Sequence, residues 1–122
     1  MTSVGRARAK HMQGDLRMRS FRRGDTHVIE LAGDLDLTSA DDVDRELRRV
    51  ELTSAHVIAV DLQDLTFIDS TGIRLMMQAQ RRSENGSNRL AVVKGTGAVQ
   101  RLFDICGVAT SIPFIDKLPS PR

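Results

Sequence analysis

One short apolar run constrains the fold of this chain more than any other feature. Residues 57–62 (VIAVDL) are almost continuously apolar, and a run of this length and β-branched content is typical of a strand that is buried on both faces. Such strands belong to parallel sheets that carry helices above and below. The flanking sequence should therefore supply helices and further parallel strands.

Two more strands are predicted before this run. Apolar and polar residues alternate weakly over residues 16–22, and residues 27–31 are rich in Val and Ile and are closed by Ala32 and Gly33. The Gly-Asp pair at residues 24–25 is a turn signal. The two strands are therefore predicted to pair as an antiparallel hairpin.

A first amphipathic helix is predicted between the hairpin and the apolar run. Val43, Leu47 and Val50 lie at i, i+4 and i+7, which places them on one face of a helix of about three turns. Thr38 and Ser39 are each followed three residues later by an acid, which is the spacing of a capping box. The helix is therefore expected to begin at one of these two hydroxyls.

Two further helices and two further strands complete the pattern. One helix is predicted to begin directly after residues 69–72 and to end before Gly86, and the other to run over residues 97–105. The remaining strands are predicted over residues 90–93 and 111–115. Strands and helices thus alternate along the second half of the chain.

The resulting order, β-β-α-β-α-β-α-β, predicts an α/β fold. It consists of a mainly parallel sheet of four to five strands with an antiparallel N-terminal edge and about three helices. The chain of 122 residues fits one domain, expected at residues 14–116. Residues 1–13 show no hydrophobic periodicity and are expected to form a disordered basic leader, and residues 117–122 a short tail.

Charge is distributed unevenly along the chain. Residues 1–23 carry seven of the 18 basic residues and one of the 16 acidic residues. A basic arm could contact nucleic acid or anionic lipid, or it could be a leader without function. The chain has four Phe and no Trp or Tyr, which argues against an aromatic stacking platform for single-stranded nucleic acid. We therefore expect no direct binding of nucleic acid. No segment approaches the ~18 apolar residues of a membrane span, so the cytoplasm is the expected location.

Catalytic, metal and cofactor sites are not indicated. One of the three histidines lies in the leader, the other two begin predicted strands, and no pair of them has a metal-ligand spacing. Cys106 lies in an apolar run and is expected to be buried and unreactive. Residues 94–97 (KGTG) resemble a phosphate-binding loop loosely, and are better explained as a strand-to-helix turn capped by Thr96. We therefore expect no enzyme and no cofactor.

The sharpest local feature is the segment FIDSTGI at residues 67–73, where a predicted strand ends and a helix begins at once. Ser70 lies at or beside the N-cap, where its hydroxyl would accept a backbone N–H of the first turn. The same position suits a phosphate, which carries about −1.5 to −2 charges and would lie near N–H donors at the positive end of the helix. Ser70 is therefore either a plain helix cap or a phosphorylation switch.

Three stretches of the sequence carry a resemblance to a known family. They are residues 31–36 (LAGDLD), residues 60–72, which end in Asp-Ser-Thr-Gly, and residues 99–107 (VQRLFDICG). In this order they resemble three features of the STAS domain: its Gly-Glu-Leu-Asp turn, its most specific motif and its third helix. Within the STAS family, the sequence resembles the bacterial anti-sigma-factor antagonists. The resemblance covers about residues 25–116.

The resemblance implies a partner-switching module without a cofactor. Such a protein binds an anti-sigma factor that is also a serine kinase, so that the sigma factor is released. The kinase phosphorylates the serine that corresponds to Ser70 and binding is lost, and a serine phosphatase restores it. Asp36, Asp69, Thr71 and Gly72 would line the same binding surface, although Asp36 could instead be a turn or cap acid. The module is expected to be a monomer or a weak dimer.

The sequence departs from the family pattern in two places. Relatives usually finish with another helix, whereas residues 116–122 contain two prolines and would leave a smaller binding surface. Gly72 is followed by Ile73 and Arg74 where many relatives have Leu-Gly. Arg74 is included in the expected binding surface, and in the first turn it opposes the helix dipole unless it pairs with an acid or with the phosphate itself.

Two other functions remain open at this point. The chain could be a STAS accessory subunit of a membrane transport complex, in which Ser70 is a plain cap and the basic leader is attracted to anionic membranes. It could also be a small enzyme of unknown type. A negative charge at Ser70 should abolish partner binding for the phosphorylation switch and leave it unchanged for the accessory subunit.

Overall fold

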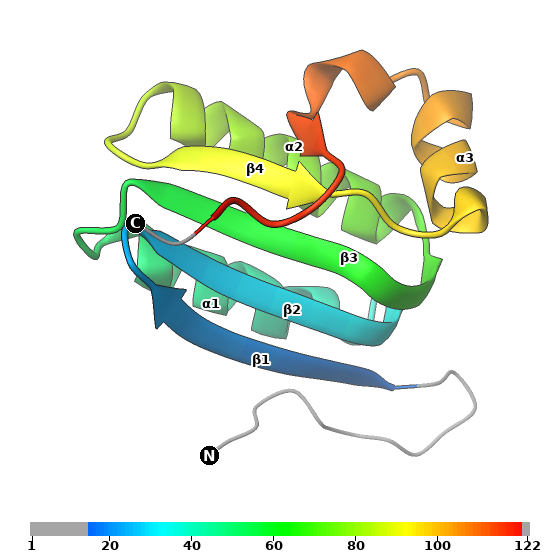
Figure 1. The fold of residues 1–122 in the computed structure, drawn as a ribbon. Helices are drawn as coiled ribbons and strands as arrows, with labels where there is room; N and C mark the ends of the chain where they lie inside the picture. The colour runs from blue at the N-terminus through cyan, green and yellow to red at the C-terminus, as the bar shows by residue number, and fades with distance from the viewer. Residues whose placement is uncertain (1–14, 121–122) are drawn as a thin grey trace.

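A mixed five-stranded sheet organises the chain (Figure 1). The computed structural model describes residues 15–120, and the expected leader over residues 1–13 lies outside them. Strand order in the sheet follows the sequence. The elements are β1 (Leu16–Arg23), β2 (Thr26–Leu35), α1 (Ala40–Glu51), β3 (Val57–Ile68), α2 (Ser70–Glu84), β4 (Arg89–Val93), α3 (Gly97–Ile105), the 3-10 helix η1 (Ala109–Ser111) and β5 (Phe114–Ile115).

The pairing of the strands confirms the predicted fold class. β1 pairs antiparallel with β2, and the other neighbours are parallel. The hairpin closes on Gly24 and Asp25, with Arg23 opposite Thr26, and Gly24 takes the left-handed backbone conformation (φ 58°) that its turn requires. The third helix begins and ends as predicted, and the Thr96 hydroxyl caps it by accepting the N–H of Val99.

β2 and β3 are longer than the sequence pattern predicts. β2 does not stop at Ala32 and Gly33 but continues to Leu35, and β3 continues to Ile68. Two register shifts in their pairing let this happen, because β3 contributes extra residues at both places. Gly33 lies in this region with φ 98°, and a Cβ at that position would come within 2.2 Å of the Asp15 carbonyl oxygen.

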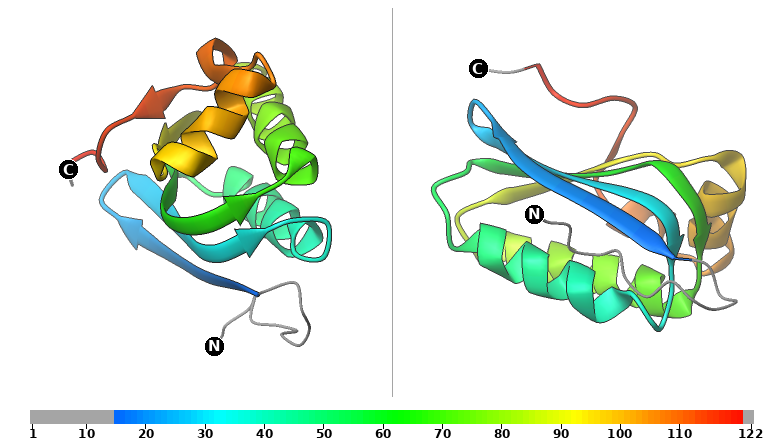
Figure 2. Two further views of the ribbon diagram at one scale, coloured as in Figure 1. Left: turned by 90° about the vertical axis from the view of Figure 1, so that its right-hand side faces the viewer. Right: turned by 90° about the horizontal axis from the view of Figure 1, so that it is seen from below.

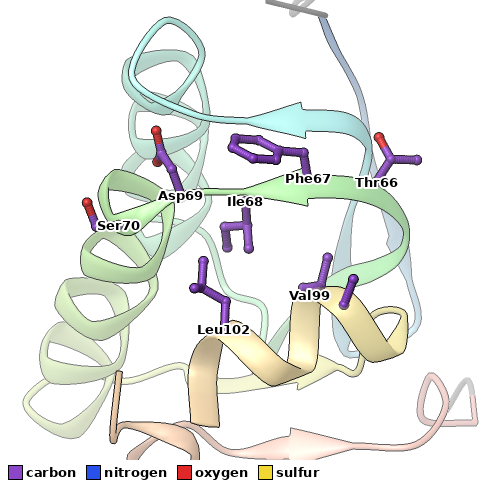
Figure 3. A pocket seen from close by; sticks show the side chains of 8 residues that line it. Thr66, Phe67, Ile68, Asp69, Ser70, Val99 and Leu102 are labelled. Carbon is purple, nitrogen blue, oxygen red and sulfur yellow. The ribbon is translucent and has the colours of Figure 1, made fainter. Parts of the chain in front are cut away.

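The helices are not arranged above and below the sheet as expected. Both views of Figure 2 place α1 and α2 on one face and the segment after β5 on the opposite face. α3 lies beside the carboxyl end of β3 (Figures 1 and 3). The core forms between the sheet and the two helices, where Val43, Leu47 and Val50 of α1 are fully buried. An irregular segment thus crosses the face of the sheet opposite α1 and α2, where a helix was expected (Figures 1 and 2).

Two predicted details at helix ends are wrong. Ser39 is the N-cap of α1, but its hydroxyl makes no capping bond; it donates to the Asp34 carbonyl oxygen at 2.9 Å and accepts the Asp36 N–H at 3.1 Å. The turn after β2 therefore takes the hydroxyl that a capping box would use. Cys106 is exposed and not buried, because it is the C-cap of α3, whose buried residues are Val99 and Phe103.

The last predicted strand is also shorter than expected. Residues 109–111 form the 3-10 helix η1, and only Phe114 and Ile115 pair with β4. Pro113 has no N–H to donate to a ladder, but its carbonyl oxygen accepts the Val92 N–H at 3.0 Å. Phe114 packs edge-on against Phe103 with ring centroids 5.0 Å apart, which fixes α3 against this end of the sheet.

Candidate functional site

The junction between β3 and α2 lies at the carboxyl edge of the parallel strands, where binding sites of open α/β sheets usually form. Asp69 lies between the two elements with an extended backbone. Its N–H donates to the Leu35 carbonyl oxygen at 3.2 Å, which ties the junction to the end of β2. The position of α2 is therefore fixed by two neighbouring strands.

Asp69, and not Ser70, is the N-cap of α2. One carboxylate oxygen of Asp69 accepts the N–H of Thr71 at 2.9 Å and the N–H of Gly72 at 3.2 Å. Both bonds satisfy donors that a helix start leaves without a partner. Ser70 was predicted to lie at or beside the N-cap and lies directly after it, but the prediction that its hydroxyl caps the helix is wrong, because Asp69 makes the capping bonds.

Ser70 is the first residue of α2, and its side chain is exposed. Figure 3 shows its hydroxyl pointing away from the side chains of Ile68, Val99 and Leu102. Because Asp69 caps the helix, the Ser70 hydroxyl is not needed to satisfy a backbone donor there. An exposed hydroxyl on a rigid helix start is accessible to a modifying enzyme.

Gly72 is buried in the first turn of α2. A Cβ at this position would come within 2.7 Å of Ile68 Cγ1, which is closer than real Cβ atoms approach, and within 3.0 Å of Leu35 Cγ, which is a tight contact. Gly72 therefore lets the helix start lie directly against the ends of β2 and β3. Its place in the expected binding surface is indirect, because it positions Ser70 and Thr71.

Asp36 lies at the same edge but is engaged in its own turn. It is buried, and its carboxylate accepts the N–H of Thr38 at 3.0 Å and the Thr38 hydroxyl at 2.7 Å. Its carbonyl oxygen accepts the N–H groups of Ser39 and Ala40. These contacts are those of the turn acid that the sequence left as an alternative.

Arg74 lies one turn after Ser70 on the exposed side of α2. Ser70, Arg74, Gln78 and Arg81 form one solvent-facing stripe of this helix. Among residues 15–120 the Arg74 guanidinium has no ion pair, and the first turn of α2 contains no acid. The acid that the sequence analysis required to offset the helix dipole is therefore not supplied within this part of the chain.

An apolar groove of about 450 Å³ reaches from α3 to Ser70 (Figure 3). Ile68, Val99 and Leu102 point toward one another in it. We call it the β3–α3 groove, and its lining residues are Thr66, Phe67, Ile68, Asp69, Ser70, Ala98, Val99 and Leu102. A partner that contacts Ser70 could also insert an apolar side chain here.

The sequence analysis missed the exposed apolar residues around the junction. Phe67 is 49% exposed and Leu37 is 75% exposed. Strand alternation could have revealed Phe67, because its neighbour Ile68 faces the core and consecutive side chains of a strand point to opposite faces. Leu37 gave no such signal, since it lies in a turn.

Metal and membrane sites are not found in the part of the chain that the structure describes. No group of three or more His, Cys, Asp and Glu residues there could hold a metal ion. None of its helices is long and apolar enough to cross a membrane. The junction itself offers a hydroxyl, carboxylates, a guanidinium and an apolar groove, which together suit the binding of another protein.

Comparison with known proteins gives a match along most of the chain. Residues 19–120 match the STAS domain family. A curated relative, the anti-sigma-B factor antagonist of Staphylococcus epidermidis, is 22% identical over 94 residues, which cover 77% of this chain and 87% of the relative. The same kind of protein from Listeria monocytogenes is 26% identical over 94 residues, with 75% and 82% covered.

Solved structures match the fold over a similar length. An anti-sigma factor antagonist from Mycobacterium paratuberculosis superposes with a TM-score of 0.75 at 18% identity, covering 84% of this chain and 87% of that chain. The antagonist SpoIIAA in its unphosphorylated form gives a TM-score of 0.68 at 22% identity, covering 84% and 88%. The five-stranded mixed sheet with three helices is thus the fold of these structures.

Proposed function

The chain belongs to the STAS domain family, and from this premise we propose that it is an anti-sigma-factor antagonist that is switched off by phosphorylation of Ser70. Its unmodified form binds an anti-sigma factor with serine-kinase activity through the start of α2 and the β3–α3 groove. A serine phosphatase returns the modified form to the binding state. The module carries no catalytic residue of its own.

The observation that supports this proposal most directly is the exposed hydroxyl of Ser70 on a rigid helix start. Asp69 takes over the capping of α2, so that a modified Ser70 would not unfold the helix. Ser70 is also one of the residues that line the β3–α3 groove, which is largely apolar. A partner that covers both this groove and the start of α2 would therefore lie close to a phosphate on Ser70.

Phosphorylation would prevent binding through desolvation and charge. A phosphoserine carries about −1.5 to −2 charges at neutral pH. Burying an unpaired charge in an interface costs several kcal/mol, and every 1.4 kcal/mol weakens binding about tenfold. One phosphate at the edge of an apolar groove is therefore enough to release a partner.

Binding of purified variants to the anti-sigma factors of the host organism tests the proposal. Each anti-sigma factor is titrated calorimetrically with wild type, Ser70→Ala and Ser70→Asp, and is incubated with wild type and ATP. We expect one phosphate at Ser70 by mass mapping, near-normal binding of Ser70→Ala, and binding of Ser70→Asp that is weaker by ~100-fold or more.

Ser87→Asp is the matched control, because Ser87 is exposed in the loop between α2 and β4, away from the junction. It should bind like wild type. Equal binding of Ser70→Asp and wild type would contradict the switch, and binding to a membrane transport protein in place of any anti-sigma factor would favour the accessory subunit. Mapping of the phosphate to Thr71 would move the switch to the neighbouring hydroxyl.

A further inference from the structure

We propose that Arg74 binds the phosphate of phosphorylated Ser70 within the same helix, and so stabilises the doubly charged phosphate of the switched-off form. The inference rests on the proposed function, because it assumes a phosphate at Ser70. Arg74 was expected to line the binding surface, and this inference gives it a specific role toward the phosphate. Arg74 would act here as a positioning residue for the phosphate.

Most backbone donors at the start of α2 are already occupied, and among the described residues only the N–H of Ser70 itself makes no hydrogen bond there. The Asp69 carboxylate accepts the N–H groups of Thr71 and Gly72, and the Ile73 N–H donates to the Asp69 carbonyl oxygen at 3.0 Å. A phosphate at Ser70 would also lie one residue from the Asp69 carboxylate, which repels it. The backbone can therefore offer the phosphate little beyond the Ser70 N–H, and a nearby cation would supply further stabilisation.

Arg74 is placed to be that cation. Residues at i and i+4 of a helix are neighbours on its surface, with Cβ atoms about 5–6 Å apart. Ser70 and Arg74 have this spacing and are both exposed. A guanidinium presents paired N–H donors that match two phosphate oxygens, and its long side chain can span one turn.

The pairing of the other helix arginines makes Arg74 unusual. The structure pairs four of the six arginines of α1 and α2 with acids: Arg45 with Asp42, Arg48 with Asp44, Arg49 with Glu46, and Arg82 with Glu51 and Asp44. Arg74 and Arg81 have no acidic partner among residues 15–120, and both lie on the stripe that begins with Ser70. A phosphate at Ser70 would supply the missing anion to the nearer of the two.

A titration of the phosphoprotein by phosphorus NMR tests the inference directly. The full chain is prepared with phosphoserine incorporated at position 70 by an expanded genetic code, in the wild-type, Arg74→Gln and Arg74→Lys forms. Arg81→Gln is the matched control, because it removes an equally exposed charge from the same stripe, three turns from Ser70. The second pKa of the phosphate is then measured at low and high salt.

We expect Arg74→Gln to raise this pKa by about half a unit relative to the wild-type chain, because a nearby cation favours the doubly charged phosphate. The Arg74→Lys form should keep part of the lowered pKa. Arg81→Gln should change the pKa less than Arg74→Gln does at low salt, and should leave it within about 0.1 unit of wild type at high salt, where three helical turns exceed the Debye length. The difference between wild type and Arg74→Gln should shrink at high salt.

Equal pKa values and equal salt dependence in wild type and Arg74→Gln would overturn the inference. Equal effects of Arg74→Gln and Arg81→Gln would also overturn it, because they would report net charge and not a contact. Because the phosphate is installed without a kinase, the result does not depend on whether a cellular kinase acts on Ser70. Failure of the proposed function and failure of this inference can thus be distinguished.

Discussion

At the scale of single residues, Asp69 has the clearest structural role in the candidate site. Its carboxylate makes two hydrogen bonds to backbone N–H groups of α2, and its N–H bonds to the end of β2. Loss of an N-cap side chain costs about 1 kcal/mol, with a range of ~0.5–2 kcal/mol. The stability of the whole helix start therefore depends in part on this one side chain.

We predict that Asp69→Ala lowers the free energy of unfolding by about 1 kcal/mol. Asp69→Asn should retain most of the wild-type stability, because an amide oxygen also accepts hydrogen bonds from the backbone N–H groups. Urea unfolding followed by circular dichroism measures the difference. Asp104→Ala, an exposed change within α3, serves as the control and should change the stability little. An Asp69→Ala variant as stable as wild type would mean that the cap contributes nothing.

The sequence could locate this junction but could not show which of its residues caps the helix. Asp69 and Ser70 are both good N-cap residues, and a choice between them needs the helix boundary to within one residue. The pairing of β2 with β3 decides it, because the bond from Asp69 to Leu35 fixes the last extended residue. The same nonlocal pairing buries Asp36 in a turn, which its short-range sequence context left open.

At the scale of secondary-structure elements, Gly72 determines how closely α2 approaches the sheet. The space that a side chain would need is filled by Ile68 and Leu35. Both of these residues are themselves buried at the ends of their strands. An added methyl group must therefore push α2 away or displace the two side chains.

We predict that Gly72→Ala lowers the free energy of unfolding by about 1–3 kcal/mol, the usual cost of overpacking a core. Gly97→Ala is the matched control, because a Cβ on this first residue of α3 would meet no atom within 4 Å. It should alter the stability by less than about 0.5 kcal/mol. If Gly72→Ala unfolds at the same urea concentration as Gly97→Ala, the close approach of α2 to the sheet does not contribute to stability.

Local patterns predicted most elements, but contacts between distant segments changed their lengths. The turn at Gly24 and Asp25 and the helix capped by Thr96 were predicted because each depends on adjacent residues. β2 and β3 were predicted too short because their register shifts arise from pairing between strands. The β3–α3 groove could not be predicted at all, since it requires the relative position of β3 and α3.

At the scale of the whole molecule, a buried histidine joins the sheet to α1. His27 in β2 lies 2.7 Å from the Ser20 hydroxyl, which in turn donates to the Glu46 carboxylate of α1. Because the hydroxyl donates its proton to Glu46, the histidine donates through Nε2. Burial lowers the pKa of His27 below its ordinary value of about 6.5, and the charge of Arg49 lowers it further.

We predict that the free energy of unfolding falls as the pH is lowered from about 6.5 to 5. A group whose pKa is lower in the folded state stabilises that state above its unfolded pKa, and this contribution is lost as the pH falls toward the folded value. Glu46 has a pKa lowered chiefly by its hydrogen bond from Arg49, so its own loss begins below about pH 4.5. The window above pH 5 therefore reports the histidine.

Urea unfolding between pH 5 and 8 measures this dependence in wild type, His27→Gln and His56→Gln. The His27→Gln variant should show a flatter profile. The control His56→Gln should keep the wild-type slope, because His56 is exposed. Parallel profiles for all three proteins would rule out His27 as the source.

The fixed position of Ser70 has a consequence for the speed of any signal that passes through it. The first turn of α2 is held by the Asp69 carboxylate and packs against the ends of β2 and β3. A phosphate added there, as proposed, would change the charge of the surface without requiring the backbone of this turn to move. No slow backbone rearrangement then intervenes, so the delay between stimulus and release would be that of the modifying enzymes and of partner dissociation.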